Sequence, residues 1–252
     1  MSNEDKRKKA LEKTREKLKE NKNRDRFMMK AVEFLDESNK NFNAEMERFR
    51  DLYSLHFPEL EKEITKDEQL VKILSDGINR KNLDSFSEMA ESSTGSPLEP
   101  ADEKILEKIY SSLKKKVEMR DELEEYVEEI VEDEMENLGA LLGPLLTARI
   151  VSLAGGLEEL ARKPSSTIQM LGAEKALFRY LKGKGTPPKH GVIFQHNFVN
   201  SLPEDERGKM ARFLANKAAM AARLDQYGEK FKGDQLREEC REKYEELKQE
   251  SG

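Results

Sequence analysis

The feature that most constrains this chain is the spacing of apolar residues within two long, charged stretches. Over 27–53, apolar side chains recur every three or four residues, which places them on one face of a helix. A similar pattern covers 105–138, where charges at Arg120 and Glu134 interrupt it. At 1.5 Å per residue, a helix over 101–137 would be about 55 Å long. The two stretches therefore predict two long helices.

The segment between these helices predicts how they are joined. His56, Phe57 and Pro58 should end the first helix, and 59–79 reads as a second helical stretch. Residues 84–100 are rich in Ser, Thr, Gly and Pro, which is typical of turns. We therefore predict an antiparallel coiled-coil hairpin. Because so thin a hairpin leaves apolar surface uncovered, a second copy of the chain is expected to pack against it.

The composition changes at Leu138. Leu, Gly and Ala dominate 138–171, which predicts short, buried helices of a compact domain. Glycines and prolines at 183–188 predict a loop, and an alanine-rich helix should resume at Pro203. The last residues, 233–252, are predicted to form a solvated, charged helical tail.

The fold predicted from these patterns is all-α: a coiled-coil dimerisation domain over 27–137, followed by a compact helical domain over 138–232. A charged segment, 1–26, precedes the hairpin. The 38% of charged residues against 36% hydrophobic ones fits long exposed helices better than one globule.

Several classes of protein are disfavoured. Cys240 is the only cysteine, which excludes an internal disulfide and a cysteine-rich zinc site and fits a reducing compartment. Residues 1–26 have no apolar core of a signal peptide. Pro144 and Arg149 interrupt the apolar run 138–156, which favours a buried helix pair over a membrane span. We therefore expect a cytosolic protein.

Charge is distributed unevenly. Residues 172–232 hold 12 Lys or Arg against 6 Asp or Glu, a net charge of +6, whereas 117–137 hold 1 against 11, a net charge of −10. The carboxylates of 121–136 surround most of a helix, so they indicate a solvated face and not a metal site. The overall charge of −6 does not exclude an RNA partner.

No catalytic or metal motif is found. Gly183, Lys184, Gly185 and Thr186 resemble part of a phosphate loop, but the lysine precedes the second glycine and no strand is predicted before it. His190 and His196 are six residues apart, which fits no familiar metal motif. For His196, contact with phosphates or bases and burial in the core are equally compatible with the sequence. We predict no catalytic residue, no metal and no cofactor.

The basic segment 172–232 is the best functional candidate on physical grounds. Its cations can contact phosphates, and Phe178, Tyr180 and Phe194 can stack on unpaired bases. The alternative is that Phe178 and Phe194 are core residues and the cations only solubilise the domain. Composition does not decide between these interpretations.

The order of several motifs adds information. The stretch from Ala148 to Arg179, which contains Gly172-Ala-Glu-Lys175, resembles the signature of the Nop family. Further matches follow in the family's order, at 188–196, 207–212 and 221–225, and one precedes it, at 53–60. The resemblance covers about residues 27–230.

The resemblance implies a scaffold protein of box C/D guide ribonucleoproteins. Such a protein bridges fibrillarin, the 2′-O-methyltransferase, to a kink-turn RNA that is already bound by a small ribosomal-type protein. It is not itself an enzyme, it forms a homodimer through the coiled coil, and S-adenosylmethionine binds only to fibrillarin. The resemblance implies the cytoplasm for an archaeal member and the nucleolus for a eukaryotic one.

The resemblance also implies which residues contact the RNA and its bound protein. Carried over onto this sequence, they are Gly172, Ala173, Glu174, Lys175, Arg179, Lys189, His190, Gln195 and His196, with backbone contacts from Arg207, Lys209 and Arg212.

One departure concerns the amino-terminal end. Family members usually carry a mixed α/β domain that grips fibrillarin, whereas here about 26 charged residues precede the predicted coiled coil. A reduced fibrillarin-binding region and a truncated chain are both compatible with this, and no motif maps the fibrillarin contact. Two further interpretations stay open: a spliceosomal relative, and a coiled-coil interaction protein without an RNA role.

Overall fold

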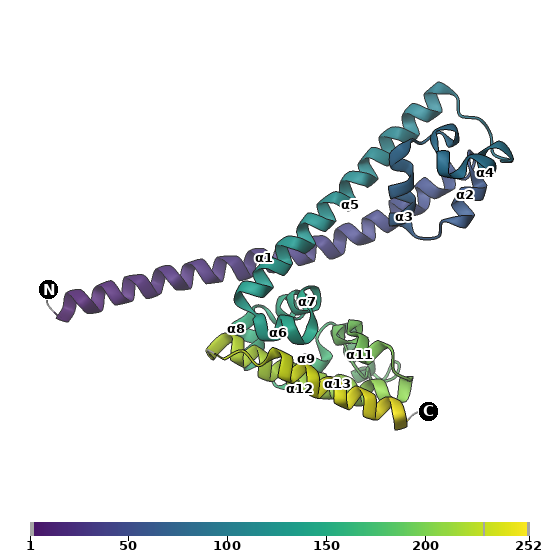
Figure 1. Cartoon of the computed structure of the whole chain (residues 1–252). Helices are drawn as coiled ribbons and strands as arrows, with labels where there is room; N and C mark the ends of the chain where they lie inside the picture. Colours follow the sequence, from purple (N-terminus) through teal and green to yellow (C-terminus); the bar gives the residue numbers. More distant parts are fainter. Residues whose placement is uncertain (1–2, 229, 251–252) are drawn as a thin grey trace. The chain divides into compact units, whose positions relative to one another are not determined.

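The computed structural model describes residues 3–228 and 230–250, with side chains from residue 24 onward. Every regular element in these ranges is a helix (Figure 1), which confirms the all-α prediction. The chain divides into two units. We call Phe34–Leu123 the hairpin unit, and Met1–Glu33 with Glu124–Gly252 the bundle unit.

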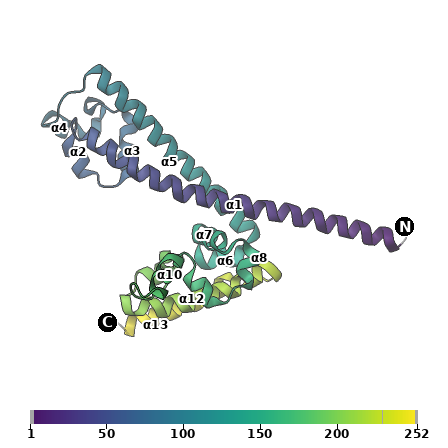
Figure 2. The same cartoon turned by 180° about the vertical axis from the view of Figure 1, so that it is seen from behind.

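Two long helices contribute to both units. They are α1 (Asn3–Tyr53) and α5 (Pro100–Glu134), which lie side by side in the hairpin unit (Figures 1 and 2). Most of the predicted three-and-four pattern is buried there, with α1 contributing Phe42, Met46, Phe49 and Tyr53 and α5 contributing Leu106, Tyr110 and Leu113. Phe34 and Ile105, which belong to the same pattern, are more than half exposed. The predicted hairpin is thus present. The predicted hairpin domain, 27–137, extends into the bundle unit at both of its ends.

The connection between α1 and α5 forms a cap, residues 57–99, with a core of its own. Its elements are α2 (Pro58–Glu63), α3 (Asp67–Ile73), η1 (Leu74–Asp76), η2 (Arg80–Asn82), η3 (Asp84–Phe86) and α4 (Ser87–Glu91). Phe57, Leu60, Leu70 and Leu74 are fully buried in it. The prediction of one helix over 59–79 is wrong, because the chain breaks after α2. The predicted loop, 84–100, is irregular only over 92–99.

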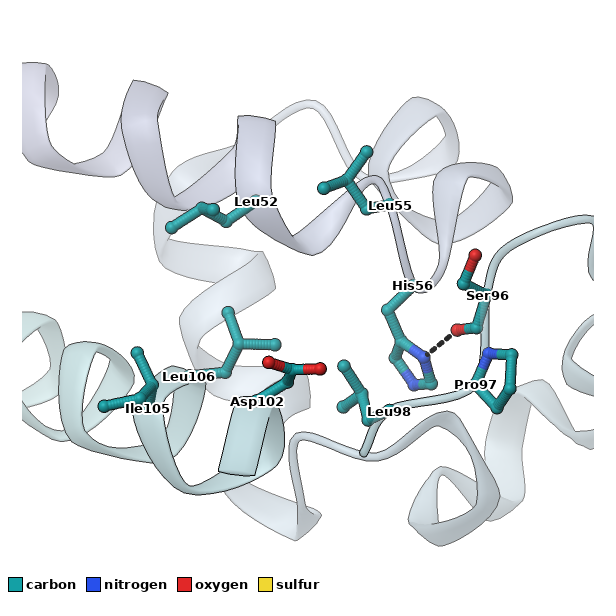
Figure 3. A pocket seen from close by; sticks show the side chains of 9 residues that line it. All are labelled: Leu52, Leu55, His56, Ser96, Pro97, Leu98, Asp102, Ile105 and Leu106. Carbon is teal, nitrogen blue, oxygen red and sulfur yellow. Dashed lines mark hydrogen bonds between the residues drawn. The ribbon is translucent and has the colours of Figure 1, made fainter. Parts of the chain in front are cut away.

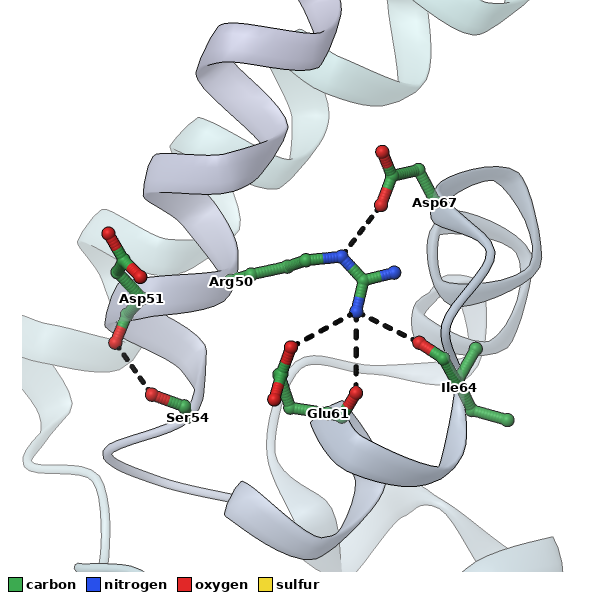
Figure 4. A network of polar contacts seen from close by, with 6 residues as sticks. All are labelled: Arg50, Asp51, Ser54, Glu61, Ile64 and Asp67. Carbon is green, nitrogen blue, oxygen red and sulfur yellow. Dashed lines mark hydrogen bonds and ion pairs between the residues drawn. The ribbon is translucent and has the colours of Figure 1, made fainter.

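Arg50 explains the break after α2 (Figure 4). Its Nη1 donates to the backbone oxygen of Ile64 at 2.8 Å and to that of Glu61 at 3.4 Å, and its Nε donates to Oδ1 of Asp67 at 2.6 Å. A side chain from α1 thus satisfies carbonyls that would otherwise need another helical turn. The local sequence of α2 carries no sign of this interaction.

The bundle unit contains α6 (Glu136–Leu142), α7 (Pro144–Ala154), α8 (Leu157–Arg162), α9 (Ser165–Met170), α10 (Glu174–Leu181), η4 (Val192–Gln195), α11 (Asn197–Asn200), α12 (Glu204–Tyr227) and α13 (Gly233–Glu250). Helix α12 packs against α6, α8, α9 and α13. Its buried face consists largely of alanines, among them Ala211, Ala215, Ala218 and Ala222, whose small side chains let the neighbouring backbones approach closely. The predicted short, buried helices over 138–171 are therefore found around one alanine-rich helix.

Helix α13 corrects the prediction of a solvated tail. It is helical as expected, but it packs against α6 and α12 and buries Leu236, Cys240 and Leu247. Lys217 of α12 forms an ion pair with Glu239. These few apolar residues define one buried face among many charges. Residues 251 and 252 lie outside the described ranges.

The apolar stretch at the start of the bundle unit forms two helices. Between α6 and α7 the chain bends by 117°. Among the described residues, no single helix is long and apolar enough to cross a membrane, and this bent pair passes such a test only when both helices are taken together, by length and composition alone.

Candidate nucleic-acid interface

Residues 172–190 form a segment of the bundle unit whose two ends are joined by hydrogen bonds. We call this segment the flap and its joined ends the base of the flap. The amide of Gly191 donates to the oxygen of Gln169 at 2.8 Å, and the amide of Val192 donates to that of Leu171 at 2.7 Å. The side-chain amide of Gln169 donates to the oxygen of Lys189 at 2.7 Å. A Cβ atom on Gly191 would lie 1.9 Å from the Leu171 oxygen, so only glycine allows this closure.

The first turn of the flap uses three predicted contact residues, Gly172, Ala173 and Glu174, for its own structure. Gly172 has a φ of +82°, which favours glycine. Its amide donates to Oε1 of Glu174 at 2.8 Å, and Ala173 is buried. The side chains of Ala173 and Glu174 thus fix the start of α10.

The outer face of α10 carries cations. Lys175 and Arg179 of α10 and Lys182, which directly follows the helix, are exposed, and their four- and three-residue spacing places them on one side of it. Ala176 and Leu177, on the other side, are half-buried. None of the three cations has an ion pair or side-chain hydrogen bond with any residue that the structure describes. Phe178 and Leu181, which are 62% and 68% exposed, flank this face.

The end of α10 is fixed by a glycine cap. The amide of Gly183, whose φ is +72°, donates to the Tyr180 oxygen at 2.8 Å, and the amide of Lys184 donates to the Arg179 oxygen at 2.9 Å. This is a Schellman motif. The glycines of the phosphate-loop-like sequence thus end a helix, whereas a phosphate loop begins one.

His190 and Arg207 meet at Phe194. The rings of His190 and Phe194 stack at 4.7 Å with an interplanar angle of 11°, and the Arg207 guanidinium lies 5.4 Å from the centre of the Phe194 ring. Burial and the Arg207 charge lower the pKa of His190, so its ring is neutral at pH 7. Arg207 also donates to the oxygens of Leu202 and Asn200, at 2.8 and 3.4 Å. Its guanidinium therefore holds the chain before α12.

The three predicted cations of α12 do not share a face. Lys209 and Arg212 are three residues apart, whereas Arg207 lies two residues before Lys209 and on another side of the helix. Lys209 pairs with Glu206 at 2.9 Å. Arg212 is exposed and has no ion pair with any residue in the described ranges. Lys189 lies 3.6 Å from Glu204 at the start of α12.

Gln195 and His196 lie at the turn before α11. Arg149 donates to Oε1 of Gln195 at 2.9 Å. Nδ1 of His196 accepts from the amide of Phe198 at 3.2 Å, and Nε2 lies 3.2 Å from the Leu141 oxygen. Because Nδ1 is an acceptor, Nε2 carries the hydrogen and the ring is neutral; burial lowers its pKa. These bonds favour the structural interpretation of His196.

The predicted residues thus divide by role. Lys175, Arg179 and Arg212 present uncommitted charge, whereas Ala173, His196 and Arg207 position backbone. Lys182 and Lys184 are exposed cations of the same flap that the resemblance does not name. The spacing of Lys182 from Lys175 and Arg179 could have identified Lys182, whereas no such spacing identifies Lys184.

A second surface lies between α1 and α5 in the hairpin unit (Figure 3). A pocket of about 430 Å³ is lined by Leu52, Leu55, Leu98, Ile105 and neighbouring residues. A further pocket of about 630 Å³, which also includes Leu52, continues it along the two helices. Leu52, Leu55 and Ile105 are each about half exposed or more. We call this surface the hairpin groove.

The groove ends at His56, which is hydrogen-bonded to the cap. Nε2 of His56 accepts from the amide of Arg80 at 3.0 Å, so Nδ1 carries the hydrogen and donates to the Ser96 oxygen at 2.8 Å (Figure 3). Nη1 of Arg80 donates to the oxygens of His56 and Gly95, at 2.6 and 2.8 Å. Burial lowers the pKa of His56 and keeps the ring neutral.

Across the described ranges, no group of three or more His, Cys, Asp or Glu side chains is placed to hold a metal ion. The fold and the site define a class: all-α proteins in which a coiled-coil hairpin is joined to a helical bundle with an exposed basic flap.

Comparison with known proteins specifies this class. Residues 34–246 match the Nop family, whose description reads "snoRNA binding domain, fibrillarin". The chain therefore belongs to the Nop family.

Relatives agree with this assignment. The chain is 35% identical to an uncharacterized NOP5 family protein of Methanocaldococcus jannaschii, over 89% of this chain and 58% of that protein. It is 33% identical to nucleolar protein 56 of Mus musculus, over 91% and 43% of the two chains. A chain in the crystal structure of a fibrillarin/Nop5p complex is 30% identical, with a TM-score of 0.59, over 96% of this chain and 77% of that one. The chain thus spans about half the length of the two protein relatives and about three quarters of the chain in the solved complex.

Proposed function

We propose that this chain is the scaffold of a box C/D guide ribonucleoprotein, which bridges fibrillarin to a kink-turn RNA bound by a small ribosomal-type protein. Membership of a family described by snoRNA binding and fibrillarin supports this role, as does the similarity to a chain of a fibrillarin/Nop5p complex. The observation that carries the RNA side is the uncommitted cationic face of α10.

The flap suits recognition of a shaped RNA together with a protein. Its cations are held on a helix that is fixed at both ends, so little order has to be gained on binding. Lys175, Arg179 and Lys182 would contact phosphates, while the exposed Phe178 and Leu181 beside them offer stacking or apolar contact. Neither set provides a large surface alone, which is why we expect binding to require the preformed RNA–protein complex.

The hairpin groove is where we place self-association. Leu52, Leu55 and Ile105 leave apolar surface exposed along both helices, and a second hairpin would cover it. In this arrangement, one guide RNA carries two copies of the scaffold and two fibrillarin molecules.

The chemistry belongs to the partner in this proposal. Methyl transfer and S-adenosylmethionine binding take place on fibrillarin, and this chain positions the enzyme over the RNA without taking part in the reaction. The relatives named as nucleolar proteins suggest the nucleolus for a eukaryotic member, and we expect the cytoplasm for an archaeal one.

The direct test is a gel shift of a kink-turn RNA with and without the small protein. We expect tight binding only to the RNA–protein complex, and weakening by about 1–3 kcal/mol for Lys175→Glu or Arg179→Glu, the range for charged hydrogen bonds. Lys114→Glu is the matched control, because Lys114 is an exposed lysine of the hairpin unit without an ion pair to any described residue. Circular dichroism should show unchanged helix content in all three variants.

Three results would contradict the proposal. Equally tight binding to bare RNA would show that the small protein is not needed for binding. Charge reversal on α10 without effect on any partner would favour a coiled-coil interaction protein, and recovery of a spliceosomal small nuclear RNA with the native protein would favour the spliceosomal relative. Sedimentation with fibrillarin tests the bridging role and the dimer together.

A further inference from the structure

A small pocket at the C-terminal end of α5 has no part in the proposed RNA contact. It encloses about 330 Å³ and is lined by Val131, Gly139, Ala140, Pro144 and Phe231. The exposed Glu128, Glu132 and Glu136 also line it, and we call them its edge. All of these residues belong to the bundle unit. The volume is near the lower end for binding pockets, about 300 Å³, and fits one apolar side chain with part of its neighbours.

The aromatic wall of this pocket is held in place by the backbone on both sides of it. Oδ1 of Asn137 accepts from the amide of Lys232 at 2.6 Å, and Nδ2 donates to the Lys230 oxygen at 3.5 Å. Asn137 is itself bound to Asp225, whose Oδ1 accepts from its side-chain and backbone amides at 2.8 and 2.9 Å. Phe231 lies between the two bonded residues and is 48% exposed.

Two glycines make room for this arrangement. A Cβ atom on Gly233 would lie 2.6 Å from the Ala140 Cβ and 2.9 Å from the Phe231 ring. A Cβ atom on Gly139 would lie 2.8 Å from Cγ1 of Val131. Phe231 is thus exposed although both of its chain neighbours are hydrogen-bonded to Asn137 and Gly233 packs closely against its ring. A phenylalanine held in this way forms a built surface and contributes little to the core.

The edge of the pocket is acidic. Glu128, Glu132 and Glu136 are exposed, and their side chains have no ion pair or hydrogen bond with any residue the structure describes. The half-buried carboxylate of Asp225 lies on the adjacent helix terminus. Lys230 and Lys232 flank Phe231, but neither lines the pocket. Such an edge repels RNA phosphates and attracts cations.

We propose that this pocket docks a basic segment of a protein partner, with one apolar side chain against Phe231 and lysines or arginines on the three glutamates. Glu128 and Glu132 are one helical turn, about 6 Å, apart. That separation matches cations four residues apart on a helix, or two apart on an extended chain. The pocket holds the apolar side chain of the partner, and the spacing of the carboxylates selects the spacing of its cations.

The test uses the full chain and a capped peptide with a lysine at every fourth position and one central phenylalanine, measured by fluorescence anisotropy at low salt. We expect binding that weakens about tenfold for Phe231→Ala, as for the loss of an anchor, and about as much for Glu128→Gln with Glu132→Gln. Glu125→Gln with Glu129→Gln is the matched control. These exposed residues have the same spacing on the same helix and do not line the pocket, so we expect less than a roughly twofold change.

Equal weakening by the two pairs of substitutions would overturn the proposal, because it would indicate attraction to α5 as a whole. An unchanged affinity of Phe231→Ala, or of a peptide with alanine in place of its phenylalanine, would also overturn it. Equally tight binding of a peptide with glutamine in place of every lysine would overturn it too, because it would show that the carboxylates do not bind the cations of the peptide. The kink-turn gel shift of Phe231→Ala should remain normal, which separates this proposal from the RNA-binding one.

Discussion

The cap of the hairpin unit and the flap of the bundle unit use cations in opposite ways. At the cap, Arg50 of α1 and Arg80 of the cap itself are directed inward and donate to backbone oxygens between helices. In the flap, Lys175 and Arg179 are directed outward and have no partner among the described residues. Both regions are short helices and loops with several charges. What separates a structural cation from an unpaired one here is whether unpaired carbonyls lie within its reach.

The largest effect that tests this difference is expected from Arg50→Ala. Removal of the guanidinium leaves carbonyls at the end of α2 and the Asp67 carboxylate without a partner. We expect a loss of about 3 kcal/mol, at the low end for a buried pair because Asp67 and Glu61 remain partly exposed. Urea unfolding measures the loss, and hydrogen exchange should localise it to α2 and α3.

Arg48→Ala is the control for this substitution. Arg48 is on the same helix and pairs with Asp51, but both side chains are largely exposed, so the change should stay within about 0.5 kcal/mol. Similar losses for the two variants would mean that the buried network around Arg50 contributes no more stability than an exposed ion pair.

A smaller loss is expected from Gly191→Ala, which acts on the base of the flap. The new Cβ atom would collide with the Leu171 oxygen, and overpacking of this kind costs about 2 kcal/mol. Because the flap would shift with its base, RNA binding should also weaken, although no cation is lost. A variant of normal stability and normal RNA affinity would show that the flap does not depend on this closure.

Arg207 and Lys209 extend the comparison within α12. Arg207→Ala removes two hydrogen bonds to backbone oxygens and the contact with Phe194, and we expect a loss of about 1.5 kcal/mol. Lys209→Ala removes only an exposed pair with Glu206 and should change stability by less than about 0.5 kcal/mol. Thermal unfolding of the two variants side by side provides the measurement, and the reverse order would contradict the assigned roles.

Effects of pH are also expected, and they have opposite signs in the two units. Burial lowers the pKa of His56 below 6.5, so the unfolded hairpin unit binds a proton more readily than the folded one. The contribution of His56 to the stability of the hairpin unit is therefore complete above the unfolded pKa of about 6.5. It decreases as the pH falls below that value, because the unfolded state is protonated first. His56→Gln should flatten this dependence in urea unfolding curves, and an unchanged dependence would assign it to other groups.

In the bundle unit, burial and the neighbouring Asp25 carboxyl raise the pKa of Glu134 to about 7. Stability from this group is full below its unfolded pKa, near 4.5, and is lost as pH rises through about 7. Glu134→Gln should therefore stabilise the bundle unit relative to the wild type at alkaline pH and leave it nearly unchanged in acid. The opposite order would contradict the raised pKa.

The sequence predicts those parts of the fold that depend on local pattern. The long helices follow from three-and-four spacing, and the buried helices of 138–171 follow from apolar composition. The break after α2 could not be predicted, because its cause is Arg50, a side chain eight residues before the helix begins. The burial of α13 was missed because Leu236, Cys240 and Leu247 are few among many charges.

The same distinction holds for the candidate site. The uncommitted cations Lys175 and Arg179 lie where the motifs placed them, and their role in RNA contact stays a prediction. The sequence does not decide the role of His196, because its assignment requires the Leu141 oxygen, which is distant in sequence. The separation of Arg207 from Lys209 could have been predicted from the 3.6-residue period of a helix alone.

The central claim is that the outer face of α10 contacts RNA phosphates, and the salt dependence of binding tests it most directly. The affinity of the wild type and of the triple variant Lys175→Ala, Arg179→Ala, Lys182→Ala for the kink-turn RNA–protein complex should be measured across a range of salt concentrations. A plot of log affinity against log salt concentration has a negative slope. We expect this slope to be shallower by about 2 to 3 in the variant, close to 1 for each phosphate contact removed. An unchanged slope would contradict the claim, even if the affinity itself decreased.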